Sequence, residues 1–391
     1  MSSGLVVVGS GPAGLAAATA YREHCADDDI VIVSADEAAP YNRPPLSKDY
    51  LRGEAGEDTL PLQEPSFYPQ NRIALRLNCE VTGIDVAGRL LRLAGGAQVP
   101  YAALVLATGA RPKVLPVPGA ADGRVHQLRS LAQARSLRSA AANASRAIVI
   151  GSGFIGCEAA ASLALRGVDV TLITNEDRPQ EARLGDFAGQ RIIGWLTAFG
   201  VSMITGAEIT NITDGRSVQL KGRGAAHAEL ILVAGGIEAA TELAAGAGLA
   251  MSAGRIVVDA SMRTSAPGIL AAGDAVQARN PAAGRALTVE HWGDAAAMGR
   301  VAGITAAGER AAWDSVPGFW SEIGDRTLKY AAWGDGFDNT HAVDHGDGAF
   351  TVWYSRAGII VGVLTHDADD DFERGNDLVS GQAPASAVQA S

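Results

Sequence analysis

Cysteine is scarce in this chain of 391 residues, and Cys25, Cys79 and Cys157 form no CxxC or CxxxxC pair. Neither a thiolate zinc site nor a locally encoded redox disulfide is expected, and the chain suits a reducing compartment. Apolar runs are short as well, because none approaches the roughly eighteen residues of a transmembrane helix. The apolar stretch at 5–20 follows no basic region and is interrupted by glycines, so we assign it to the fold rather than to a signal peptide.

Basic residues are outnumbered, with 32 lysines and arginines against 43 aspartates and glutamates and a net charge of −11. This balance argues against nucleic acid or an anionic membrane as the main partner. With 47% hydrophobic and 19% charged residues and 47 glycines, the composition excludes disorder, a coiled coil and a disulfide scaffold. We expect a soluble, cytoplasmic globular protein of about two to three domains.

A strand, a glycine-rich loop and a helix of small residues occur twice in the sequence. The first copy has apolar strands at 5–8 and 30–33, and the second copy has them at 147–150 and 168–173. The loops between these strands begin with GSGPAG at 9–14 and GSGFIG at 151–156. Both are GxGxxG motifs between a strand and a helix, which is typical of dinucleotide-binding sites.

Each glycine of the motif has its own physical task. The first makes a tight turn, the second lets the backbone approach a pyrophosphate, and the third lets the helix pack on the strand. The helix N-terminus then supplies free N–H groups and partial positive charge to the phosphates. Two motifs predict two bound dinucleotides. The candidate binding residues of the two loops are Gly9, Gly11, Pro12, Ala13, Gly14, Gly151, Gly153, Phe154, Ile155 and Gly156.

Two further apolar strands end in small residues. One runs into Ala107, Thr108 and Gly109, and the other ends in Gly273 and Asp274. Ligands of parallel sheets lie beyond the carboxyl ends of the strands, which is where both segments fall. A proline-rich loop at 40–49 is too long and too restricted for a simple connection.

The composition changes from about residue 313, where aromatic residues become frequent. Segments 350–354 and 359–364 read as a hairpin, and a polar helix follows, which predicts a small α+β domain. The tail after Gly381 is rich in alanine, serine and glutamine, and we expect it to be frayed.

Several segments, taken in order, resemble the oxygenase-coupled ferredoxin reductases, the family of the putidaredoxin, biphenyl dioxygenase and rubredoxin reductases. Besides the two glycine loops, they are YNRPPLSK at 41–48, ATGARP at 107–112, GFIGCE at 153–158, AAGD at 271–274 and EHW at 290–292. The RPPLSK segment is the most specific of these. The glycine loops alone would indicate only a flavoprotein that binds two dinucleotides.

The resemblance implies an α/β fold with two Rossmann-like dinucleotide-binding domains and a small α+β C-terminal domain. An FAD domain at 1–110 and 238–312 would enclose an NAD(P)H domain at 111–237, and residues 313–391 would form the C-terminal domain. In this family hydride passes from NAD(P)H to FAD, and single electrons leave for a [2Fe–2S] ferredoxin or rubredoxin that feeds an oxygenase or cytochrome P450. No metal site is expected in the chain, because thiolate clusters are missing.

The resemblance also assigns roles to residues. Arg43 and Lys48 would contact FAD, Asp274 would bond its ribitol, and Lys48 would pair with Glu158 beside the flavin. Trp292 would open a helix whose N-terminus faces the flavin, and Trp320 would lie between the flavin and the iron–sulfur partner. The remaining candidate cofactor-binding residues are Asp36, Ala107, Thr108, Gly109, Arg111, Thr174, Asn175, Gly236, Gly273, Glu290 and His291.

Two strand ends depart from the family pattern. The expected ribose-binding carboxylate of the first motif is displaced by one residue, to Asp36. In the second motif, Thr174 stands where NADH-specific relatives carry glutamate, so Thr174 and Asn175 become the candidate ribose ligands. Arg178 and Arg183 follow, and an arginine there can accommodate a 2′-phosphate. NADH and NADPH both remain open, with NADH favoured.

The same residues bear on other activities of this fold. Disulfide reductases and NADH peroxidases need cysteines near the flavin, and segment 44–51 contains none. A redox-sensing or scaffolding protein of the apoptosis-inducing-factor type, with slow turnover, is the alternative from another class. His341 and His345 superficially suggest a metal site, but the glycines that follow them favour an exposed turn.

The charge of the C-terminal segment bears on the partner. Residues 331–391 contain ten aspartates and glutamates against two arginines, a net charge of −8, which would repel an acidic ferredoxin. We therefore expect docking on a basic strip near Trp320, formed by Arg310, Arg326 and Lys329.

Overall fold

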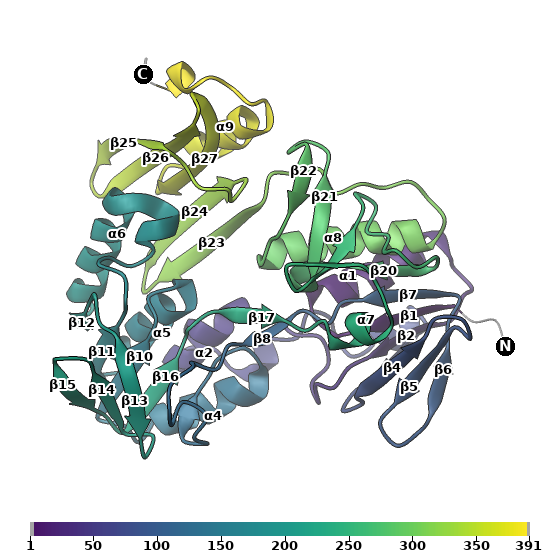
Figure 1. The fold of residues 1–391 in the computed structure, drawn as a ribbon, viewed down its shortest axis with the longest axis horizontal. Helices are drawn as coiled ribbons and strands as arrows, with labels where there is room; N and C mark the ends of the chain where they lie inside the picture. The colour runs from purple at the N-terminus through teal and green to yellow at the C-terminus, as the bar shows by residue number, and fades with distance from the viewer. Residues whose placement is uncertain (1–3, 389–391) are drawn as a thin grey trace.

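The computed structural model describes residues 4–388, which form three bodies that lie around a common centre (Figure 1). Two of them are parallel sheets with helices, and the third is an antiparallel sheet near the C-terminus. Within the described residues, no helix is long and apolar enough to cross a membrane.

The first sheet is parallel, with strand order β20-β7-β1-β2-β3. Its strands are short and fully or nearly fully buried at the centre, as expected for a sheet covered on both faces. The strands are β1 (Leu5–Val8), β2 (Ile30–Val33), β3 (Ile73–Arg76), β7 (Ala103–Leu106) and β20 (Ile269–Ala271).

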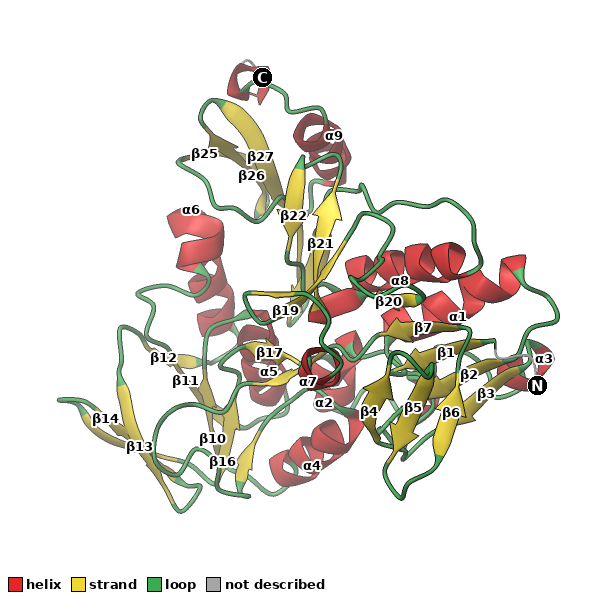
Figure 2. Cartoon of the chain, turned by 45° about the vertical axis from the view of Figure 1, so that its right-hand side comes forward, coloured by secondary structure: helices red, strands yellow, loops and turns green. Residues whose placement is uncertain are grey.

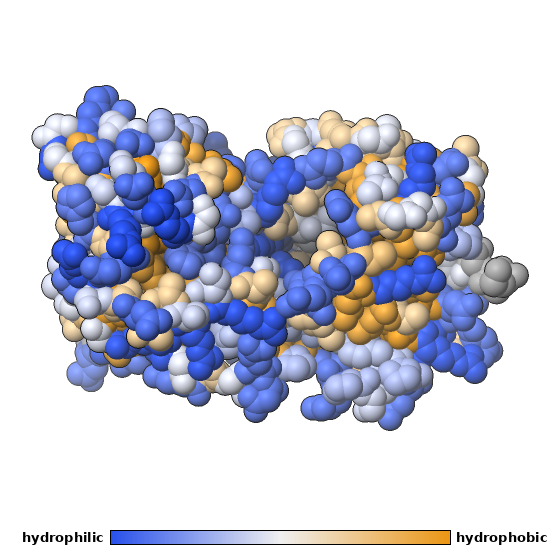
Figure 3. All heavy atoms as spheres, turned by 90° about the horizontal axis from the view of Figure 1, so that it is seen from below, coloured by the Kyte–Doolittle hydropathy of each residue, from blue (hydrophilic) through white to orange (hydrophobic). Residues whose placement is uncertain are grey.

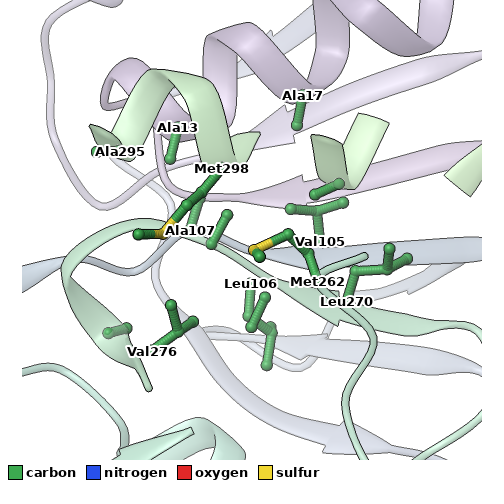
Figure 4. Close-up of a cluster of buried hydrophobic side chains, with 14 of the residues drawn as sticks. Ala13, Ala17, Val105, Leu106, Ala107, Met262, Leu270, Val276, Ala295 and Met298 are labelled. Carbon is green, nitrogen blue, oxygen red and sulfur yellow. The ribbon is translucent and has the colours of Figure 1, made fainter. Parts of the chain in front are cut away.

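Helices α1 (Pro12–His24) and α8 (Trp292–Ala306) pack closely on one face of this sheet. A Cβ at Gly299 would lie 2.1 Å from the carbonyl oxygen of Ala13, so only glycine permits this approach. Figure 4 shows the apolar side chains between the two helices and the strands, with Met298 and Met262 among them. This contact brings a late segment of the chain back onto the first motif.

The second sheet repeats the arrangement, with strand order β12-β11-β10-β16-β9 and all strands parallel. Its strands are β9 (Val125–His126), β10 (Arg146–Ile150), β11 (Asp169–Ile173), β12 (Ser202–Ile204) and β16 (Leu230–Val233). Its helices are α4 (Leu131–Ala141), α5 (Phe154–Leu165) and α6 (Glu181–Ala198). Helix α6 contains a kink at Gly185, which has φ of +78°.

A two-stranded antiparallel ribbon connects the two bodies. It consists of β8 (Ala110–Pro112) and β17 (Ile237–Ala239), where the chain crosses from the first sheet to the second and returns. The predicted domain boundaries at 110/111 and 237/238 fall within this ribbon. The division into domains itself stays a prediction.

Smaller elements decorate the two bodies. A three-stranded sheet consists of β4 (Val81–Asp85), β5 (Leu90–Leu93) and β6 (Gln98–Pro100), and another of β13 (Ile209–Thr213), β14 (Ser217–Leu220) and β15 (Gly224–His227). The four-stranded sheet contains β18 (Met251–Ser252), β19 (Arg255–Val258), β21 (Val276–Asn280) and β22 (Arg285–Leu287). The short helices are η1 (Pro44–Ser47), α2 (Asp49–Arg52), η2 (Glu57–Thr59), α3 (Phe67–Gln70), α7 (Glu242–Gly246) and η3 (Gly273–Ala275).

The third body is an antiparallel sheet with strand order β23-β24-β27-β26-β25. Its strands are β23 (Gly318–Ile323), β24 (Arg326–Ala332), β25 (Asn339–Gly346), β26 (Ala349–Arg356) and β27 (Ile359–His366), and α9 (Asp369–Ser380) packs on it. In Figure 2, β21 and β22 rise toward this sheet. The Arg285 guanidinium of β22 lies 6.0 Å from the ring centroid of Trp333, which joins the two sheets.

The prediction of a frayed tail after Gly381 is wrong for the residues described. Pro384 forms a β-bridge with Ile359, and η4 (Ala385–Val388) follows. Val388 is buried, and the Arg374 guanidinium donates to the carbonyl oxygen of Ala387. Apolar contact and backbone pairing therefore hold a segment whose composition suggested disorder.

Candidate functional site

A large cavity, with a volume of about 1670 Å³, lies where the three bodies meet. The space-filling view in Figure 3 shows a hollow between two halves of the molecule, with many hydrophobic residues on the right-hand half. The cavity collects most of the residues predicted from the sequence. They are Gly9, Gly11, Pro12, Ala13, Asp36, Arg43, Lys48, Ala107, Thr108, Gly109, Arg111, Gly153, Phe154, Ile155, Glu158, Gly236, Gly273, Asp274, Glu290, His291, Trp292 and Trp320.

Five predicted residues do not line this cavity: Gly14, Gly151, Gly156, Thr174 and Asn175. The three glycines permit close backbone packing, because a Cβ at any of them would collide with a neighbouring carbonyl oxygen. A Cβ at Gly14 would lie 2.0 Å from the carbonyl oxygen of Gly9, and a Cβ at Gly156 would lie 2.0 Å from that of Gly151. They let each helix pack against the strand before it.

The first glycine loop has the shape that a pyrophosphate requires. Gly9 has φ of +109°, a conformation that glycine adopts readily. A Cβ at Gly11 would meet no atom within 4 Å, so the backbone here faces open space at the cavity. Gly11 is also the N-cap of α1 and has no side-chain cap, which leaves the helix N–H groups available to an anion. These features fit FAD.

The second loop repeats this geometry closely. Gly151 has φ of +104°, and Gly153 again faces open space. Gly153 is the N-cap of α5 and has no side-chain cap. The ring centroids of Phe154, the first residue of α5, and Phe319 of β23 lie 4.4 Å apart. This loop fits the pyrophosphate of a second dinucleotide, NAD(P)H.

Asp36 lies at the carboxyl end of β2, on the cavity wall. Its carboxylate accepts hydrogen bonds from the Tyr41 hydroxyl, at 2.9 Å, and from the Ala38 backbone N–H, at 3.1 Å. Ser34 holds the turn, because its hydroxyl pairs with that of Ser10 at 2.8 Å and accepts from the Asp36 backbone N–H. The carboxylate is thus held in place beside the first glycine loop.

Asp274 meets a partner that the sequence did not indicate. The Arg129 guanidinium donates to its carboxylate at 2.5 Å, from a position 145 residues away. The Nε of Arg129 is buried without a partner among the described residues, and the side chain lines the cavity. The available signal was the position of Arg129 just after β9, at the carboxyl end of a parallel strand.

Arg255 is a second residue that sequence reasoning missed. Its guanidinium donates to the backbone carbonyl oxygen of Asp274 and pairs with the carboxylate of Glu290. It therefore ties the end of β20 to the segment before α8. Its place on the short strand β19 carried no recognisable pattern.

Lys48 and Glu158 form a buried ion pair at the centre of the site. The Lys48 Nζ lies 2.8 Å from Glu158 Oε2, and the two residues are 5% and 2% exposed. Glu158 Oε2 also accepts from the Ser47 hydroxyl at 2.5 Å, and Oε1 accepts from the Ser321 hydroxyl at 2.7 Å. The Glu322 backbone N–H donates to Oε1 at 3.3 Å. One carboxylate thus joins all three bodies.

Trp320 lies on β23 and is 50% exposed, which is unusual for a tryptophan. The Lys48 Nζ lies 4.9 Å from its ring centroid, so the indole touches the buried pair on one side and solvent on the other. Neighbouring Phe319 points inward and packs on His291 and Tyr330. Burial raises the pKa of Tyr330 to about 12, so this phenol stays neutral near pH 7.

The N-terminus of α8 faces the cavity, with His291 as N-cap and Trp292 as the first helical residue. The Asp294 carboxylate accepts from the Gly318 backbone N–H at 3.1 Å and lies 3.2 Å from His291 Nδ1. This contact fixes the helix end against β23. The partial positive charge of a fifteen-residue helix therefore points into the site.

The side chains that follow β11 are not arranged as the sequence alone suggested. Thr174 is buried, and Asn175 is exposed. Arg178 is paired with Glu181 and Asp186, each at 3.3 Å. Arg183 lies instead over the Phe154 ring, on the cavity wall. Arg178 and Arg183, the two candidates for binding a 2′-phosphate, therefore do not converge on one position.

The surface charges near Trp320 are mostly paired. Lys329 lies 2.6 Å from Asp369, and Arg326 lies 3.2 Å from Asp325. Arg310 is exposed but follows the C-terminus of α8, about 22 Å along this fifteen-residue helix from the end that contacts β23. The expected basic strip of Arg310, Arg326 and Lys329 is therefore not continuous: Arg310 lies away from Trp320, and the other two residues are paired.

His341 and His345 lie on strand β25, so the predicted turn is wrong for them, because the turn begins only at Asp347. His345 Nε2 lies 2.9 Å from the Thr351 hydroxyl and 3.3 Å from Asp371. Across residues 4–388, no group of three or more histidines, cysteines, aspartates and glutamates is placed to hold a metal ion.

The chain is similar in sequence and in structure to known proteins. Residues 3–299 match the family model described as pyridine nucleotide-disulphide oxidoreductase. The chain is 34% identical to rhodocoxin reductase from Rhodococcus erythropolis, over 99% of this chain and 91% of that one. It is 35% identical to the ferredoxin–NAD(+) reductase component of the anthranilate 1,2-dioxygenase system from Burkholderia cepacia, over 89% and 86%. The structure superposes on the covalent putidaredoxin reductase–putidaredoxin complex with a TM-score of 0.92 at 28% identity, over 98% of this chain and 94% of that one.

Proposed function

Because this chain belongs to the pyridine nucleotide-disulphide oxidoreductase family, we propose that it is a flavin-dependent NAD(P)H:ferredoxin reductase. It takes a hydride from NAD(P)H onto FAD and passes single electrons to a [2Fe–2S] ferredoxin or a rubredoxin. That carrier then serves an oxygenase or cytochrome P450. The observation that carries the proposal is the buried Lys48–Glu158 pair, placed between two glycine loops and in contact with the exposed Trp320.

The flavin, when bound, supplies the exchange between a two-electron donor and one-electron acceptors. The chain supplies binding, orientation and charge. The backbones at Gly11 and Gly153 leave room for the two pyrophosphates, and the N-termini of α1 and α5 favour their negative charge. Asp36 accepts ribose hydroxyls, and Asp274 is the candidate ligand of the ribitol.

Charge near the flavin is set by buried groups. Lys48 and Glu158 form a buried ion pair out of contact with bulk water, in which each residue compensates the charge of the other. The N-terminus of α8 adds a positive end on another side of the cavity. This helix end favours an electron-rich, negatively charged ligand. The rings of Phe154 and Phe319 contact each other and line the cavity between the second glycine loop and β23.

Electrons leave where the site reaches the surface, at Trp320. Its ring contacts Lys48 within the site and is half exposed, so it is the candidate exit. The acceptor docks over this residue. Lys329 and Arg326 are already paired with aspartates, so their contribution to steering toward an acidic ferredoxin is reduced.

Two further assignments belong to this proposal. The FAD domain comprises residues 1–110 and 238–312, the NAD(P)H domain 111–237, and the C-terminal domain 313–391. The protein works in the cytoplasm, which the lack of disulfide pairing among Cys25, Cys79 and Cys157 supports.

The test is reduction of the purified holoprotein under anaerobic conditions. We expect a yellow protein with one FAD per chain. NADH or NADPH should bleach its flavin absorbance, at about 450 nm, within seconds, and the protein should then reduce a [2Fe–2S] ferredoxin catalytically. A colourless protein would refute the flavin assignment. Bleaching that takes minutes would favour the redox-sensing alternative. Rapid bleaching without reduction of any ferredoxin or rubredoxin would refute the acceptor.

A further inference from the structure

The carboxylate of Glu176 is held beside the second glycine loop in a way that the mechanism above does not use. Its Oε2 accepts from the Ser152 hydroxyl at 2.8 Å and from the Gln180 backbone N–H at 3.1 Å. Within residues 4–388, no hydrogen bond reaches Oε1, and the residue is partly exposed. One oxygen is thus anchored, and the other remains able to accept from a ligand.

The hydroxyl pair and the turn that carries the carboxylate occur at the first motif as well. There Ser10 pairs with Ser34 at 2.8 Å, the Asp36 backbone N–H donates to the Ser34 hydroxyl, and Asp36 presents its carboxylate. In the second motif, Ser152 pairs with Thr174 at 2.8 Å, and the Glu176 backbone N–H donates to the Thr174 hydroxyl at 3.2 Å.

The carboxylate therefore stands two residues beyond the hydroxyl residue in both copies. Glu176 is also twenty residues after the last glycine of its loop, the spacing at which a carboxylate meets the adenosine ribose.

Thr174 itself is poorly placed for a ligand. It is 4% exposed, and its hydroxyl is already engaged by Ser152 and by the Glu176 backbone. The loss of an acidic residue at the strand end is therefore compensated two positions later.

The charges around Glu176 oppose a 2′-phosphate. Asp177 is its neighbour, and the positive charge of Arg178 is matched by Glu181 and Asp186. Arg223 donates to the backbone carbonyl oxygens of Thr205 and Gly206, and Arg183 lies over the Phe154 ring.

We propose that Glu176 binds the adenosine ribose hydroxyls of NADH and makes this chain reject NADPH. A carboxylate whose remaining oxygen accepts from a ribose hydroxyl cannot also tolerate a phosphate of about −1.5 to −2 charge at that position. The inference rests on the proposed function only in taking NAD(P)H as the electron donor.

The experiment measures binding rather than turnover. Isothermal titration calorimetry of the FAD-loaded protein with NAD⁺ and NADP⁺ gives the ratio of the two dissociation constants. We expect wild type to prefer NAD⁺ and Glu176→Gln to lower that preference at least about tenfold, the effect of one charged hydrogen bond. The amide oxygen of Gln can still accept from Ser152, so the variant should fold and retain FAD.

Asp177→Asn is the matched control, because it removes the same charge from the adjacent, exposed residue. It should change the preference by less than about threefold, since exposed charges are screened. The inference is overturned if wild type prefers NADP⁺, if Glu176→Gln stays within threefold of wild type, or if both variants lower the preference equally. Loss of ferredoxin reduction with NAD⁺ binding intact would instead count against the proposed function.

Discussion

The strongest prediction concerns the two halves of the central ion pair, changed singly and together. Lys48→Met removes the ammonium but keeps the apolar stem, which leaves Glu158 buried with donors from Ser47, Ser321 and the Glu322 backbone. Breaking a buried pair from one side costs about 3–5 kcal/mol. Three surviving donors place Lys48→Met at the lower end of that range.

Glu158→Gln removes the negative charge that balances the Lys48 ammonium, which keeps only neutral partners: the new amide oxygen, the Pro44 carbonyl oxygen at 3.0 Å and the face of Trp320. Its cost should reach the upper half of the range. The double variant contains no unpaired charge, and replacement of a buried pair by neutral groups is often nearly neutral. We therefore expect the double variant to be more stable than either single variant.

The assay is thermal unfolding of the FAD-loaded proteins, followed by flavin fluorescence. An unfolding entropy of ~2.1 cal/mol/K per residue gives about 0.8 kcal/mol/K for this chain, so the single variants should lose about 4–6 °C in Tm. Anaerobic stopped-flow reduction by saturating NADH should slow in both single variants.

Lys329→Met serves as the control, because Lys329 also pairs with an aspartate but is 37% exposed in its side chain. A surface pair contributes about 0–1 kcal/mol, which is little more than 1 °C here. If the double variant lost the sum of the two single losses, the residues would be energetically independent and the reasoning would be refuted. Unchanged reduction rates in both single variants would remove the pair from the mechanism.

Three further outcomes follow from the geometry. Gly11→Ala should fold with unchanged secondary structure yet retain less FAD, because its Cβ enters the open space that a pyrophosphate would occupy. Gly14→Ala should be strongly destabilised, because its Cβ would collide with the carbonyl oxygen of Gly9. Circular dichroism and flavin content distinguish the two variants, and equal behaviour would contradict the assignment. Trp320→Ala should leave flavin reduction by NADH within about twofold but lower ferredoxin reduction at least about tenfold in steady-state assays, and an equal loss in both would show a structural role. Burial raises the pKa of the Cys157 thiol, so we expect this thiol to resist a thiol reagent near pH 8 in the native protein. The partly exposed Cys25 and Cys79 should react first, and mass spectrometry of the labelled peptides measures the order of reaction.

The sequence by itself determined the two glycine loops, the strands that precede them and the helices that follow. These features are local, because a positive φ at Gly9 or Gly151 and close packing at Gly14 or Gly156 restrict neighbouring residues directly. The resemblance carried by the RPPLSK segment also led to Lys48 and Glu158, which the structure brings to 2.8 Å. Family and function were accessible for the same reason, since short segments carried the chemistry.

Tertiary structure decided the rest, because the deciding partners are distant in the sequence. Arg129 reaches Asp274 across 145 residues, and Ser321 reaches Glu158 across 163. Nothing in the neighbourhood of Ser321 indicates that its hydroxyl would meet a carboxylate from another body. Composition likewise could not show that Lys329 would be neutralised by Asp369. The value of a charge depends on which opposite charge the fold brings within a few ångströms of it, and that is a property of the folded chain alone.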